Sequence, residues 1–313
     1  MPIGEDRAAA PDNQRWGVLL LAHGAPDRLT DIPEFLLNVR GGRPLPEAAV
    51  AEIVERYARI GGGSPLRRIT EQQAQALAEK LGRPVYVGMR NWKPFILEGV
   101  ERMSADGIER VIAACLAPQN SRTSVGLYRK SFDEAVAKAG ARFAAEFIES
   151  WHEHPGLIRA FAERITAART HAEAQAGTRV PVVFTAHSVP ERTIAAGDPY
   201  AEQVHQTAAL VAEAISLDDY RVAYQSQGMT AEPWIGPTVE STIDDLAAQG
   251  HRHVLIAPVG FVSDHVEILY DIDVVFREYG RTKGVTVWRS ESLNSSPPFI
   301  AALASLVKSR IGA

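Results

Sequence analysis

Three features are scarce in this 313-residue sequence: cysteine, long apolar runs and an excess of basic side chains. The single cysteine, Cys115, excludes an intramolecular disulfide, and it excludes a Cys₄ zinc site or a Cys₄ iron–sulfur cluster within one chain. Apolar stretches such as 18–22 and 254–259 have the length of a strand and fall far short of the roughly 20 residues that span a bilayer. The net charge of -5 argues against non-specific binding to nucleic acid.

What remains is the composition of a folded globular protein, because 46% of the residues are hydrophobic and 23% are charged. Residues 1–15 are polar and lack the apolar segment of a secretory signal, so we expect them to form a frayed or disordered tail. The sequence therefore predicts a cytoplasmic protein, with association at a membrane surface left open.

Short apolar segments alternate with longer amphipathic segments along the chain. The predicted strands are 17–22, 85–88, 110–117, 180–186, 221–225, 253–258 and 285–289. The predicted helices are 46–60, 71–81, 93–106, 128–139, 157–174, 200–215, 238–248 and 299–311. This alternation predicts an α/β fold with doubly wound parallel sheets. Because the pattern runs twice, we expect an N-terminal domain over residues 16–150 and a C-terminal domain over residues 151–313.

The loops that follow predicted strands are the candidate site, because ligands in open α/β sheets bind beyond the carboxyl ends of the strands. These loops are 22–26, 117–121, 186–190, 226–228 and 258–267. His187 is the strongest candidate, since the Ser-Val-Pro after it favours an extended turn that presents the imidazole to a cleft. An imidazole accepts protons near neutral pH and binds divalent metals. The alternative is a histidine that only makes structural hydrogen bonds.

A second group of polar residues comprises Asp264, His265 and Glu267. If a helix begins near Ser263, then Glu267 and Asp271 lie one turn apart on one face. Two such carboxylates repel, which raises one pKa, and together they suit a divalent cation. The alternative is an N-cap at Ser263 or Asp264 followed by a solvated acidic face.

The glycine-rich segment 60–66, IGGGSPL, matches neither a dinucleotide fingerprint nor a Walker loop. Arginines flank it on both sides, and the set is Arg40, Arg43, Arg56, Arg59, Arg67 and Arg68. Guanidinium groups bind carboxylates and phosphates through paired hydrogen bonds, so this set suggests an anionic small molecule. Surface charges that serve solubility are the alternative.

Four motifs together resemble the ferrochelatases, the enzymes that insert ferrous iron into a porphyrin. They are AHSVPERT, IGGGSPL with EQQ behind it, WIGP and VGFVSDHVEILYDID. The resemblance runs from about Gly17 to the last predicted helix. It implies two Rossmann-like halves with a porphyrin cleft between them, and a lyase of haem biosynthesis. It implies porphyrin and Fe²⁺ as substrates, no tightly bound cofactor, no nucleic acid, a monomer, and transient contact with neighbouring haem-pathway enzymes or a membrane surface.

The resemblance also implies a catalytic and metal-binding set of His187, Glu267 and His23. His187 would face the centre of the macrocycle as proton acceptor, iron ligand or both, and Glu267 would face it across the cleft. His23 stands where the soluble branch commonly has a tyrosine near the iron position. We expect it to reach the metal directly, and the alternative is a neutral imidazole that only makes hydrogen bonds there. Asn91 and Gln119 replace histidines of relatives, and Val275 replaces a carboxylate, which puts an outer metal site in doubt.

The propionate contacts implied by the resemblance are Arg40, Arg56, Tyr57, Ser64 and Tyr128. They match residues of the soluble bacterial branch that uses coproporphyrin III, a ring with four propionates where protoporphyrin IX has two. Coproporphyrin III is therefore the favoured substrate and protoporphyrin IX the alternative. A non-catalytic haem or porphyrin carrier is less favoured, because a carrier needs no histidine paired with a glutamate.

Overall fold

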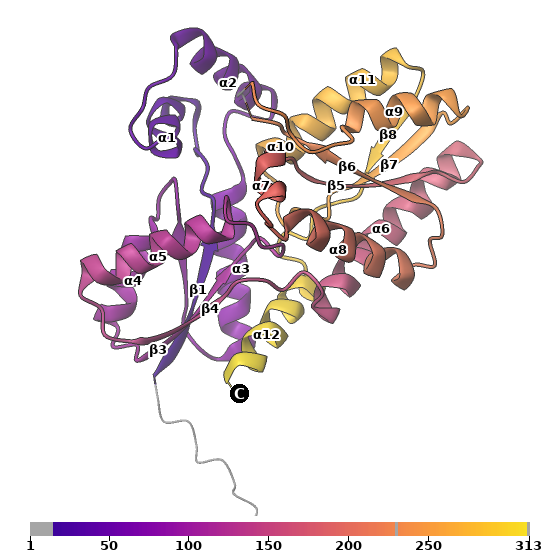
Figure 1. Cartoon of the computed structure of the whole chain (residues 1–313). Helices are drawn as coiled ribbons and strands as arrows, with labels where there is room; N and C mark the ends of the chain where they lie inside the picture. The colour runs from indigo at the N-terminus through magenta and orange to yellow at the C-terminus, as the bar shows by residue number, and fades with distance from the viewer. Residues whose placement is uncertain (1–14, 229–230, 312–313) are drawn as a thin grey trace, which may run out of the picture.

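The computed structural model describes residues 15–228 and 231–311, so the predicted tail lies outside the described residues except for Arg15. Two four-stranded parallel sheets form the fold (Figure 1). The first, in the order β2-β1-β3-β4, contains β1 (Trp16–Ala22), β2 (Val85–Met89), β3 (Arg110–Cys115) and β4 (Ala144–Ile148). The second, in the order β6-β5-β7-β8, contains β5 (Val182–His187), β6 (Tyr220–Gln225), β7 (His253–Ala257) and β8 (Thr286–Arg289). The predicted α/β fold with a doubled pattern is confirmed.

Eight longer helices correspond to the predicted ones. They are α2 (Glu47–Arg59), α3 (Leu66–Leu81), α4 (Ile96–Ala105), α5 (Val125–Ala139), α6 (Pro155–Ala176), α8 (Tyr200–Ala214), α9 (Val239–Ala248) and α12 (Pro297–Ile311). Besides β4, the elements that the sequence pattern did not predict are short: η1 (Leu29–Asp31), α1 (Ile32–Val39), α7 (Glu191–Ala195), α10 (Val266–Leu269), the π-helix η2 (Asp271–Phe276) and α11 (Arg277–Thr282). The helix considered near Ser263 begins at Val266, as α10, and the Ser263 hydroxyl accepts a hydrogen bond from Gln73.

The central strands are buried on both faces, as parallel sheets with helices on either side require. In β1, the side chains of residues 18–21 are wholly buried. One apolar core runs through both halves: it includes Leu20 of β1 and Phe184 of β5, and the rings of Trp151 and Phe299 stack within it at 6.1 Å. The core is therefore shared between the sheets.

The C-terminal helix α12 returns to the first half of the chain and lies beside α3 (Figure 1). It also packs on α6, and Arg110 of β3 donates a 2.7 Å hydrogen bond to the carbonyl oxygen of Arg310. The boundary predicted at residue 150 separates the two sheets along the chain, and α12 crosses back over it.

Within residues 15–228 and 231–311, no helix combines the length and apolar character that crossing a bilayer requires. The cytoplasmic location and the monomeric state expected from the sequence stay predictions.

Candidate active site

A cavity of about 580 Å³ lies where the carboxyl ends of strands from both sheets converge. Residues at or just beyond the ends of five strands line it: His23 after β1, Arg90 after β2, Gln119 after β3, His187 at the end of β5 and Ser226 after β6. The volume falls within the range of roughly 300–1,000 Å³ typical of small-molecule sites. This placement agrees with the rule that ligands of open α/β sheets bind beyond the carboxyl ends of the strands.

His187 and Glu267 are in direct contact on the wall of this cavity. The Nδ1 atom of His187 lies 2.8 Å from Oε2 of Glu267. His187 ends β5 and Glu267 lies on α10, which follows β7, and β5 pairs with β7 in the sheet. Loops that follow adjacent strands lie side by side, which brings the two groups together.

The expectation that Glu267 faces His187 across the cleft was therefore wrong. No planar ring fits between atoms 2.8 Å apart, so a macrocycle meets both groups from the same side. Both residues belong to the second sheet's half of the chain, and the first sheet's half contributes His23, Tyr57 and Tyr128 to the lining.

The charges of His187 and Glu267 shift each other's pKa. Burial opposes the imidazolium, yet the negative charge of Glu267 and the hydrogen bond to it raise the pKa of His187 above its ordinary value. Burial also opposes ionisation of the carboxyl, but His187 holds the pKa of Glu267 at about 2. Because a carboxylate only accepts, Nδ1 of His187 carries the shared hydrogen and Nε2 is left for a ligand in the cavity.

Neighbouring polar groups hold the pair from behind. The Tyr200 hydroxyl donates a 3.0 Å hydrogen bond to the carbonyl oxygen of His187, and the amide of Gln225 donates one of 2.7 Å to that of Glu267. Ser226, held at a positive φ of 60°, donates its hydroxyl to the carboxylate of Asp271. Burial and repulsion from Glu267 raise the pKa of Asp271 to about 6. A second carboxyl group that can carry a proton near neutral pH thus lies next to the pair.

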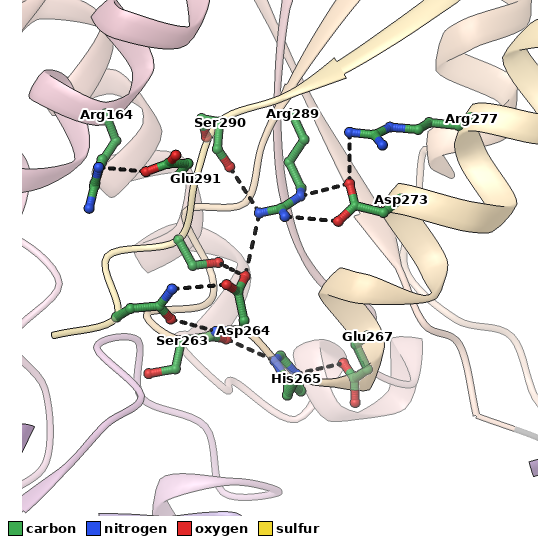
Figure 2. A network of polar contacts seen from close by, with 12 residues as sticks. Arg164, Ser263, Asp264, His265, Glu267, Asp273, Arg277, Arg289, Ser290 and Glu291 are labelled. Carbon is green, nitrogen blue, oxygen red and sulfur yellow. Dashed lines mark hydrogen bonds and ion pairs between the residues drawn. The ribbon is translucent and has the colours of Figure 1, made fainter. Parts of the chain in front are cut away.

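An ion network fixes the segment that carries Glu267 (Figure 2). Arg289 of β8 makes two hydrogen bonds, of 2.9 and 2.8 Å, to the carboxylate of Asp273 on η2, and it lies 3.4 Å from Asp264. Asp264 also accepts hydrogen bonds from Ser292 and Asn294. Arg289 therefore links the residues before α10 to the π-helix after it, which places Asp264 in a supporting network rather than at an N-cap.

Replacing Arg289 by alanine is expected to lower the free energy of unfolding by about 2 kcal/mol, because it leaves the largely buried Asp264 without its cation and leaves Asp273 with Arg277 alone. We also expect kcat for metal insertion to fall about 10-fold with little change in porphyrin affinity, since Glu267 loses its support. Denaturant unfolding and steady-state kinetics measure the two effects, and Arg289→Lys should restore part of both.

The matched control is Arg164→Ala, which breaks the exposed Arg164–Glu291 pair seen in the same network (Figure 2). An exposed pair contributes about 0–1 kcal/mol, so this variant should behave almost like the wild type. Equal effects of the two substitutions would contradict the supporting role of Arg289.

His23 lines the cavity, but its two ring nitrogens already have partners. Nδ1 donates to the carbonyl oxygen of Gly24 at 2.9 Å, and Nε2 accepts from the amide of Asn91 at 3.0 Å. Burial and the charge of Arg90 lower the pKa of His23 to about 4, so the ring is neutral. Iron binding at Nε2 would require Asn91 to release that lone pair, and the assignment of His23 as a ligand stays a prediction.

Three of the five expected propionate contacts line the cavity: Arg56, Tyr57 and Tyr128. Burial raises the pKa of both tyrosines, so each keeps a hydroxyl hydrogen to donate. Arg40 and Ser64 are not among the lining residues. The Nε of Arg40 donates to the carbonyl oxygen of Arg43 on an exposed turn, and the Ser64 hydroxyl accepts from the amide of Leu66. Their propionate roles stay predictions.

Across the described part of the chain, no three His, Cys, Asp or Glu side chains are arranged as a metal site. The predicted metal set of His187, Glu267 and His23 stays a prediction, with iron as a substrate. Gln119 is buried and donates to Thr207 and to the carbonyl oxygen of Val259, which is a structural role.

Sequence reasoning missed three residues of the site: Arg90, Tyr200 and Arg289. Arg90 directly follows β2, so the strand-end rule applied to that loop would have found it. Tyr200 and Arg289 act through contacts across the fold, and no sequence signal marks those contacts.

Comparison with known proteins identifies the family of the chain. The family model described as Ferrochelatase matches residues 15–311. A ferrochelatase of Acidobacterium capsulatum is 50% identical, covering 95% of this chain and 94% of that protein. A coproporphyrin III ferrochelatase of Geobacillus kaustophilus is 37% identical, covering 94% and 95%.

Solved structures show the same fold at low identity. The sirohydrochlorin chelatase SirB from Bacillus subtilis, in complex with cobalt, matches with a TM-score of 0.56 at 11% identity over 94% of each chain. CbiX, described as the terminal enzyme of sirohaem biosynthesis in denitrifying bacteria, gives 0.53 at 13% identity, over 94% of this chain and 98% of that one. With the family model matched over residues 15–311, the chain belongs to the ferrochelatase family and is a metal-chelating lyase of haem biosynthesis.

Proposed function

We propose that this enzyme inserts ferrous iron into coproporphyrin III in preference to protoporphyrin IX. The observation that carries the chemistry is the 2.8 Å contact between His187 and Glu267 on the wall of a cavity large enough for a small-molecule ligand. Support for the substrate comes from Arg56, Tyr57 and Tyr128 in the lining, and from relatives such as the coproporphyrin III ferrochelatase of Geobacillus kaustophilus.

Metal insertion breaks two pyrrole N–H bonds and forms bonds from the ring nitrogens to Fe²⁺, and two protons leave. His187 accepts a proton at Nε2, the nitrogen that faces the cavity. Glu267 stabilises the imidazolium that forms, and its contact with Nδ1 supports this role. Asp271, with a pKa of about 6, receives the proton next and passes it on before the second pyrrole N–H bond breaks.

The test is an anaerobic insertion assay with ferrous iron that compares coproporphyrin III and protoporphyrin IX side by side. We expect kcat/KM to be at least about 10-fold higher for coproporphyrin III, because its extra carboxylates gain charge-assisted hydrogen bonds. Equal values for the two rings would contradict the substrate preference. Tight porphyrin binding without turnover of either ring would instead indicate a carrier.

A further inference from the structure

Arg90 is a cation in the cavity wall whose hydrogen-bonding groups are not used by the protein. It follows β2 and lines the cavity, and its Nε atom is buried without a hydrogen-bond partner. In the described ranges 15–228 and 231–311, no side chain or carbonyl group accepts a hydrogen bond from its guanidinium or pairs with its charge. Arg90 as a whole is half-buried, and burying even one donor of a cation without a partner is costly, so the protein alone leaves this group incomplete.

The other charged groups of the lining are already paired. Arg56, the second arginine there, is 41% exposed and forms an ion pair with Glu52 at 2.5 Å. Glu267 is bonded to His187, and Asp271 accepts from Ser226. Arg90 therefore differs from every other charged group among the described lining residues, and a ligand is the remaining source of a counter-ion.

The geometry of Arg90 suits a carboxylate. Its guanidinium carbon lies 5.7 Å from the ring centroid of Tyr128, a contact that orients the flat group. A guanidinium fixed in this way presents paired N–H donors that match the two oxygens of a carboxylate.

We propose that Arg90 binds a carboxylate that coproporphyrin III carries and protoporphyrin IX lacks, an inference that rests on the proposed function. Protoporphyrin IX has both carboxylates on one edge and apolar vinyl groups on the opposite edge. A ring of this kind enters with its apolar edge towards the wall that carries Arg90, whose Nε is buried, and with its carboxylates near more exposed groups such as Arg56. Arg90 then meets a vinyl group of protoporphyrin IX but a propionate of coproporphyrin III.

The consequence is that an unpaired charge on the protein discriminates between the two porphyrin rings. A buried group built to hydrogen-bond a substrate strongly disfavours an analogue that lacks the partner. Arg90 selects the four-carboxylate ring both by binding it and by leaving a half-buried guanidinium, whose Nε is fully buried, unpaired against the two-carboxylate ring.

The test compares both rings in the full-length enzyme carrying Arg90→Gln, a substitution that removes the charge and keeps a polar side chain. We expect kcat/KM for coproporphyrin III to fall about 10- to 100-fold, mainly through KM. For protoporphyrin IX we expect kcat/KM to rise, because the cavity wall no longer holds an unpaired charge. Fluorescence titration of the metal-free rings should give the same opposite shifts in Kd without any turnover.

Arg102→Gln is the matched control, since Arg102 stacks on Tyr86 at 5.9 Å but does not line the cavity. Its ratio of kcat/KM values for the two rings should equal that of the wild type. Arg90→Lys, which keeps the charge but not the paired donors, should lie between the wild type and Arg90→Gln. If thermal unfolding shows that Arg90→Gln is poorly folded, the Arg90→Lys variant tests the proposal in its place.

The inference is overturned if Arg90→Gln changes both rings by the same factor or changes neither. The ratio of kcat/KM for coproporphyrin III to kcat/KM for protoporphyrin IX in the wild type tests the proposed substrate preference. The change in that ratio on substitution tests the role of Arg90. The two can therefore fail separately.

Discussion

Replacing His187 by alanine is expected to lower kcat for iron insertion by roughly 10²–10⁴-fold while the porphyrin still binds. The reason is that His187 offers Nε2 to the cavity and has its charge supported by Glu267 through Nδ1. Alanine removes the proton acceptor but leaves Arg56, Tyr57 and Tyr128 in the lining. Porphyrin affinity should therefore change far less than the rate.

Two measurements separate these effects: fluorescence titration with metal-free porphyrin, and single-turnover insertion under anaerobic conditions. His171→Ala serves as the control, because His171 lies on α6 with its ring against Trp288 and outside the cavity lining. Turnover of His187→Ala within about threefold of the wild type would remove this residue from the chemistry.

The second large effect is expected from Glu267→Gln, which keeps the shape of the side chain and removes its charge. We expect kcat to fall about 100-fold, because the imidazolium formed during proton abstraction loses its counter-charge. Porphyrin binding should change little. The carboxylate is ionised throughout the neutral range, since its pKa lies at about 2, so the substitution removes a full negative charge.

The same variant should change the pH dependence in a definite direction. Glu267 raises the pKa of His187 above 6.5, and a proton acceptor must first lose its resting proton. Wild-type kcat/KM should therefore rise with pH, with a midpoint above 6.5. In Glu267→Gln the burial of the imidazole is no longer outweighed, so the midpoint should move to lower pH.

A pH–rate profile of kcat/KM for both enzymes checks this shift. Glu291→Gln, which breaks only the exposed pair with Arg164, is the control and should keep the wild-type midpoint. If the midpoint of Glu267→Gln stays at the wild-type pH, then Glu267 does not set the protonation of His187.

The sequence identified the chemistry of the site better than its geometry. His187 and Glu267 were found because one ends an apolar segment and the other lies in a specific motif. Their relative position depends on β5 pairing with β7, and the order of strands in a sheet is a tertiary property that local patterns do not encode. For that reason two residues in contact were expected on opposite walls.

Other differences have local causes. Strand β4 was missed because Ala144 and Ala145 are exposed and Glu146 interrupts the apolar run. The propionate role of Arg40 was assigned from the resemblance alone. In the structure, the turn that carries Arg40 directs its Nε to the carbonyl oxygen of Arg43. Arg90 follows a predicted strand, but the loop after 85–88 carries no histidine or carboxylate and was not among the candidate strand-end loops.

The return of α12 to the first half has a consequence for how the protein is made. Side chains of α12 such as Leu303 share one core with Leu77 of α3 and Leu20 of β1. During synthesis the first sheet leaves the ribosome long before the helix that covers α3. A nascent chain that stops after residue 150 thus presents an uncovered apolar surface, and the two sheets should acquire their stability together once translation has passed α12.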